Sequence, residues 1–111
     1  MTLLSRLSAA VGPDRELDAE IAKAVDFWPD GFCQHQPAPA YTGSLDAAMT
    51  LASDGEEYEI STLYGPAVVT LPLNRSDIDP ITVRRVDGNV ILAFVECAMQ
   101  YRAALRARGI L

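Results

Sequence analysis

The sequence is poor in the residues that most often carry covalent or metal chemistry. It has two cysteines and one histidine in 111 residues, which is too few for a disulfide framework. It also lacks a glycine-rich phosphate loop, a dinucleotide fingerprint and a nucleophile elbow. We therefore expect no cofactor and no enzyme of a standard nucleotide-handling kind, and two free thiols suited to a reducing cytoplasm.

Long hydrophobic runs are also missing. The apolar stretch from Val90 to Val95 is followed at once by Glu96, far short of the roughly 20 apolar residues that span a bilayer. Arg6 interrupts the apolar N-terminal run instead of preceding it, which is unlike a secretory signal. We expect a cytoplasmic protein without membrane contact, folded as a single domain over residues 1–111, because this length supports one core.

Basic residues are fewer than acidic ones and are unevenly placed. The formal charge is −6; residues 1–60 hold three basic and eleven acidic side chains, whereas residues 61–111 hold six arginines and four acids. A phosphate backbone would be repelled at long range, so we expect no direct nucleic-acid partner. The arginine excess of the second half either forms a local patch or lets the two halves attract one another.

Four segments have helical periodicity or helix-terminal signals. Ser44 and Asn89 are suited to cap the third and fourth of these helices, and Gly109 is suited to end the last. Gly12 ends the first helix in this interpretation. The predicted helices cover residues 1–11, Asp14 to Val25, Leu45 to Leu51, and Val90 to Arg108.

Between the third and fourth helices the pattern changes to extended, β-branched segments. We predict strands over Tyr58 to Tyr64, Ala67 to Leu73, and Ile81 to Val86, the first two forming a hairpin. Pro72 cannot donate to a ladder, so the second strand is either an edge strand or ends there. The order of elements predicts an α+β fold, with a short antiparallel sheet of about three strands packed between helices.

Residues 26–43 combine three prolines, two glycines and four aromatic side chains. The prolines and glycines exclude a long regular element. The aromatic residues Phe27, Trp28, Phe32 and Tyr41 would bury large areas on packing, so we predict an ordered loop over the core. The same aromatic residues are candidates for a protein contact surface, because aromatic side chains carry much of the energy of interfaces.

Three segments resemble the phage ABA-sandwich domain family of small phage and prophage proteins. They run from Glu16 to Ala24, from Pro39 to Leu51, and along the alanine-rich helix from Ala93 to Arg108. The segment from Pro39 is the most specific, and the resemblance covers roughly the whole chain. It implies a phage-derived accessory protein with a sheet between helical layers, and it brings no established activity.

Two candidate sites follow from the residues themselves. Cys33 and His35 could supply a nucleophile or part of a metal site, but residues two apart need not point together, and a zinc site would lack two ligands. Arginines form the only basic concentration, and two of them, four apart on a helix, suit a bidentate grip on phosphate or carboxylate. The candidate anion contacts are Arg84, Arg85, Arg102 and Arg106.

These observations favour a non-enzymatic phage or prophage accessory protein that binds a host or phage protein, or associates with itself as a homo-oligomer. The alternative is a small-molecule sequestering protein that traps an anionic nucleotide used in antiphage signalling, through the four arginines. An enzyme using Cys33 and His35 is the third interpretation.

Overall fold

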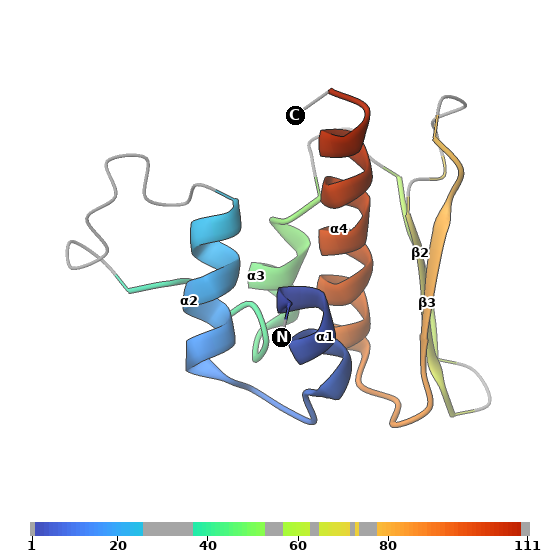
Figure 1. Cartoon of the computed structure of the whole chain (residues 1–111). Helices are drawn as coiled ribbons and strands as arrows, with labels where there is room; N and C mark the ends of the chain where they lie inside the picture. The colour runs from blue at the N-terminus through green and yellow to red at the C-terminus, as the bar shows by residue number, and fades with distance from the viewer. Residues whose placement is uncertain are drawn as a thin grey trace.

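The computed structural model describes residues 2–25, 37–52, 57–62, 65–71, 73 and 78–109. Along this part of the chain three helices are followed by three strands and a last helix, in the predicted order, and each element lies within the segment that the sequence predicts (Figure 1). The fold class is α+β, which confirms the prediction. The elements are α1 (Leu3–Ala9), α2 (Arg15–Ala24), α3 (Leu45–Met49), β1 (Glu59–Ser61), β2 (Ala67–Leu71), β3 (Ile81–Arg85) and α4 (Val90–Ala107).

Side-chain caps set the N-terminal ends of α3 and α4. The Ser44 hydroxyl accepts a hydrogen bond from the backbone N–H of Ala47 at 3.3 Å. The Asn89 side-chain oxygen accepts one from the N–H of Leu92 at 3.0 Å. Both caps confirm the sequence prediction, because each satisfies a backbone donor that a helix leaves unpaired in its first turn.

The sequence predicts that Gly12 and Gly109 end helices, and the structure confirms this for Gly109 alone. Gly109 follows α4 with φ of 74°, a left-handed conformation that favours glycine at a helix C-terminus. Helix α1 ends at Ala9, before Gly12, because Ala10 is already extended with ψ of 145°. The end of α1 is therefore set by something other than the glycine.

The sheet has the strand order β1-β2-β3, with both pairs antiparallel. Ile60 pairs with Val69, which pairs in turn with Val83. The hairpin of β1 and β2 is confirmed. Strand β2 is the central strand and is described as far as Leu71. Pro72 lies outside the described residues, so its predicted effect on the strand stays a prediction.

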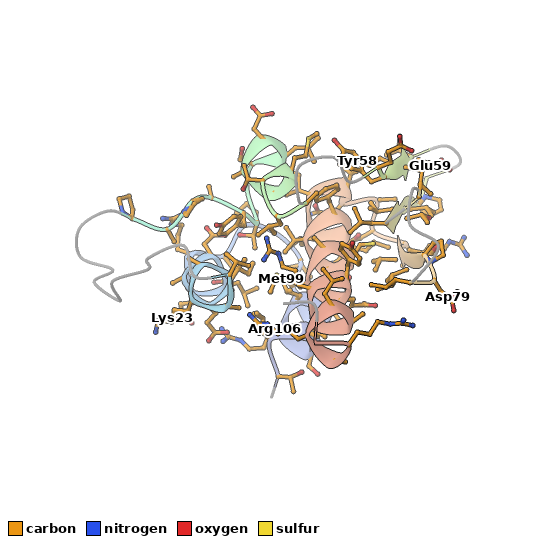
Figure 2. The ribbon with its side chains drawn as sticks, turned by 90° about the horizontal axis from the view of Figure 1, so that it is seen from above. Lys23, Tyr58, Glu59, Asp79, Met99 and Arg106 are labelled. Atoms are coloured by element: carbon orange, nitrogen blue, oxygen red, sulfur yellow. The ribbon has the colours of Figure 1, made fainter. Side chains whose placement is uncertain are left out.

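Helix α4, and not the sheet, occupies the middle of the molecule. It packs on β2 and β3 on one side, and α1 and α3 pack on its other sides (Figures 1 and 2). Helix α2 packs on α1, farther from the sheet. All described helices therefore lie on one face of the sheet, which corrects the expectation of a sheet between helices. An antiparallel sheet can leave its other face in water.

The burial of α4 agrees with this central position. All of its residues from Leu92 to Met99 are buried, and Phe94 meets the ring of Tyr58 edge to face at 5.1 Å between centroids. A helix that is apolar on most sides belongs inside a protein. None of the helices in the described ranges has the length and apolar character that crossing a membrane requires.

Candidate anion-binding pocket

Arg85, at the end of β3, is buried and fully hydrogen-bonded; 8 % of its surface is exposed. Its Nε and Nη2 each donate a hydrogen bond to the Asp87 carboxylate, at 3.2 and 2.8 Å. Its Nη1 donates to the Leu7 carbonyl at 3.1 Å and to the Glu96 carboxylate at 3.5 Å. Nη2 also donates to the Ala10 carbonyl. Together these bonds use all five N–H donors that a guanidinium has.

The partners of Arg85 explain where α1 ends. The carbonyls of Leu7 and Ala10 stand at the C-terminal end of that helix, where a cation is favourable. The hydrogen bond with Asp87, more than any other contact, raises the pKa of Arg85, and the same bond lowers the pKa of the Asp87 carboxyl. Arg85 thus joins β3 to α1 and has no donor left for a ligand, which corrects its predicted role as an anion contact.

Arg84 points to the opposite side of the sheet. Neighbouring residues of a strand alternate between faces, and Arg84 is exposed whereas Val83 and Arg85 are buried. Since α4 covers the face that carries Val83, the sheet separates Arg84 from the arginines of α4. The four arginines therefore do not form one site.

Arg102 and Arg106 do come together, as their spacing of four residues predicts. Both line a pocket of about 340 Å³ between α1, α2 and α4. Met99 and Arg106 lie on the side of α4 that faces α2 (Figure 2). The pocket is lined by Leu3, Leu4, Ala24, Met99, Arg102, Ala103 and Arg106.

Backbone carbonyls hold these two guanidinium groups in place. The Nε of Arg102 donates to the Leu51 carbonyl at 3.1 Å, and Nη2 of Arg106 donates to the Ala24 carbonyl. Each bond uses one of the five N–H donors of its guanidinium. Within the described residues the two side chains form no other hydrogen bond and no ion pair. Most of their donors thus have no partner among the residues that the structure describes.

The electrostatic surroundings of Arg102 favour an anion. Burial lowers the pKa of Arg102, and the positive charge of Arg106 lowers it further, while Tyr41 acts in the opposite direction. An arginine stays protonated despite such shifts, since its pKa in water is above about 12. Two like charges therefore share a half-buried wall, and a bound anion would reduce their repulsion.

A second hollow lies beside Arg85. It has a volume of about 470 Å³ and runs between the C-terminal end of α1, β3, and Glu96 and Gln100 of α4. Val11 and Val86 contribute to it and are 89 % and 87 % exposed. We call this hollow the β3 groove. It combines two exposed aliphatic side chains with a strand that, among the described strands, pairs only with β2.

The aromatic side chains predicted to form a contact surface fall into two groups. Tyr41 is buried, with 2 % of its surface exposed, and belongs to the core. Its burial raises the pKa of the phenol. Tyr41 therefore covers the core and does not present a contact surface. Phe27, Trp28 and Phe32 lie outside the described residues, so their predicted role stays a prediction.

One polar cluster was not anticipated from the sequence. Asp18 and Thr42 are both buried, and Oδ1 of Asp18 accepts hydrogen bonds from the backbone N–H and the hydroxyl of Thr42, each at 2.8 Å. Oδ2 of Asp18 accepts one from Arg15 at 2.8 Å, and the Thr42 hydroxyl also accepts from the N–H of Asp14 at 2.8 Å. The cluster joins the start of α2 to the segment before α3.

The described residues offer little that resembles catalytic machinery. Cys97 is buried, and burial raises the pKa of its thiol to about 11, which keeps it protonated at neutral pH. No group of three or more potential metal ligands occurs among the residues that the structure describes. Cys33 and His35 lie outside these residues, so the enzymatic interpretation stays untested.

In comparisons with known proteins, no family model, no curated protein and no solved structure matches this chain. The resemblance to the phage ABA-sandwich domain family therefore stays a prediction.

Proposed function

We propose that this chain is a non-catalytic binding protein whose ligand is a small organic anion, held by Arg102 and Arg106. One observation carries the proposal: two adjacent guanidinium groups, each bonded to one backbone carbonyl among the described residues, line a pocket of about 340 Å³ whose other described lining residues are apolar. A pocket of this size and lining, with a few convergent polar groups, is typical of small-molecule sites. This favours the interpretation of the chain as a small-molecule sequestering protein, with Arg102 and Arg106 as the anion contacts in place of the four arginines.

Thermal unfolding with a panel of organic anions tests this proposal. A ligand that binds only the folded chain raises its unfolding midpoint, so at least one of citrate, adenosine monophosphate and decanoate should raise it. The double variant Arg102→Gln, Arg106→Gln should lose the shift. Arg84→Gln is the matched control, because it removes an exposed arginine on the other side of the sheet, and it should keep the shift. The proposal fails if no anion raises the midpoint, or if both variants respond equally.

A second candidate function, self-association, is favoured by the β3 groove. An edge strand presents unpaired backbone groups that can pair with another strand. If β3 of two copies pair in antiparallel fashion about Val83, Thr82 of each lies opposite Arg84 of the other, so no like charges face each other directly. Val11 and Val86 would then lose part of their exposure to water. Protein association of this kind, with the phage accessory role implied by the resemblance, is a proposal distinct from the pocket.

Sedimentation velocity over a range of concentrations tests self-association. The parent chain should form a dimer as concentration rises, and Val86→Lys should shift the equilibrium toward monomer. Leu73→Lys provides the control, since Leu73 is also exposed, at 46 %, but does not line the β3 groove. A parent chain that stays monomeric at all concentrations would remove this candidate.

A further inference from the structure

We infer that the ligand of the Arg102–Arg106 pocket is an amphipathic carboxylate, a carboxyl head on an aliphatic tail, and not a nucleotide. This inference rests on the proposed function and specifies its ligand. The walls provide the first reason, since apart from the two arginines every described residue that lines the pocket is apolar. The apolar lining consists of Leu3, Leu4, Ala24, Met99 and Ala103.

The described lining does not offer what a nucleotide needs. Among the described residues, no aromatic ring lines the pocket to stack on a base, and no amide, hydroxyl or carboxylate side chain lines it to bind a base edge or a ribose. Leucine, alanine and methionine suit flexible alkyl chains, and the unbranched methionine adapts its shape to what it contacts. The chemistry of the wall therefore matches a hydrocarbon tail.

The pocket offers one end for the carboxylate head of the ligand, the end with the two arginines. Met99, Arg102 and Arg106 follow one another on one face of α4, and their exposure rises in that order: buried, half-buried and exposed. The charged end of the pocket thus faces water, and its apolar end lies toward the interior. A carboxylate at the arginines can accept paired N–H bonds from the planar guanidinium forks. The bonds to the carbonyls of Leu51 and Ala24 can stay in place, because they occupy only one donor of each arginine.

Isothermal titration calorimetry with a matched set of probes tests the inference. Decanoate should bind and octanoate should bind more weakly, by roughly fourfold for each buried methylene lost. Decylamine has the same tail as decanoate with the opposite charge, and it should not bind. Adenosine monophosphate and inorganic phosphate should bind at least tenfold more weakly than decanoate. Tighter binding of either phosphate than of decanoate would overturn the inference while leaving the proposed function intact.

Variants assign the binding to this pocket. Arg102→Gln and Arg106→Gln should each weaken decanoate binding tenfold or more, whereas Arg84→Gln should leave it unchanged. Ala103→Glu, which places a negative charge in the lining without removing an arginine, should weaken decanoate binding to a similar degree. Equal binding of decanoate and decylamine, or decanoate binding that none of the pocket variants weakens, would overturn the inference. If no probe binds at all, both the inference and the proposed function fail.

Discussion

Arg85 and the pair Arg102–Arg106 are the same residue type in two different situations. Arg85 has all its donors satisfied by Leu7, Ala10, Asp87 and Glu96. Each arginine of the pair makes a single described hydrogen bond, to a backbone carbonyl. A local excess of arginine in a sequence therefore does not by itself mark a binding site. What distinguishes a site is the number of donors that the fold leaves unused.

The largest expected effect is on stability, from Arg85→Ala. This change leaves the Glu96 carboxylate buried without its partner and frees the carbonyls at the end of α1. Removing one member of a buried charge pair costs about 3 kcal/mol or more. Urea unfolding should show this loss, whereas Arg84→Ala, at the adjacent exposed position, should change the free energy of unfolding by less than about 0.5 kcal/mol. Equal effects of the two substitutions would remove the distinction between the arginines.

Thr42→Val should cause a smaller loss of stability. It tests whether the buried cluster of Asp18 and Thr42 is structural as well. Valine has nearly the shape of threonine but cannot bond to Asp18 or accept from the N–H of Asp14. Leaving such groups unsatisfied costs about 1–3 kcal/mol. Thr82→Val is the control and should be close to neutral in urea unfolding, because Thr82 is exposed and its hydroxyl is within 3.0 Å of the Thr70 hydroxyl, in a contact that is exposed to water.

The pocket arginines should matter less for stability than Arg85 does. The double variant Arg102→Gln, Arg106→Gln loses two hydrogen bonds to carbonyls but also removes the repulsion between two like charges. Because these terms oppose each other, we expect the free energy of unfolding to change by about 1 kcal/mol or less. A loss as large as that of Arg85→Ala would show that the pair is structural and would weaken the case for a site.

The smallest effect that we expect is a change with pH in the contribution of Asp87 to stability. The bond with Arg85 lowers the pKa of Asp87 below its ordinary value of 3.8, so the ionised carboxylate stabilises the folded chain at pH values above 3.8. This contribution is lost as the pH falls through the lowered pKa. The stability difference between the parent chain and Asp87→Asn should therefore be larger at about pH 6 than at about pH 3 in urea unfolding. A difference independent of pH would contradict this role of Asp87.

The elements could be predicted because local rules decide them. Ser44 and Asn89 precede apolar helical runs, and a cap acts within three residues of itself. The three strands follow from their β-branched content. The central position of α4 also has a signal in the sequence, because Ala93, Cys97 and Ala98 extend the apolar surface of this helix beyond a single face.

The partners of Arg85 and Asp18 could not be predicted from the sequence. Arg85 bonds to carbonyls at Leu7 and Ala10, more than seventy positions earlier in the chain. Asp18 bonds to Thr42 across a segment with no regular pattern. Such contacts depend on how the elements pack, and neither composition nor periodicity contains that information. Sequence could therefore pair Arg102 with Arg106 on one helix face but could not separate them from Arg84 and Arg85.

NMR can test directly whether Arg102 and Arg106, and not Arg84 and Arg85, contact the ligand. The measurement follows the Nε–Hε signals of the arginine side chains while the nitrogen-15-labelled chain is titrated with decanoate. The signals of Arg102 and Arg106 should move with the added ligand, and those of Arg84 and Arg85 should stay where they are. Movement of the Arg85 signal together with the pair, or no movement of the pair at saturating decanoate, would show that the arginines are not divided in this way.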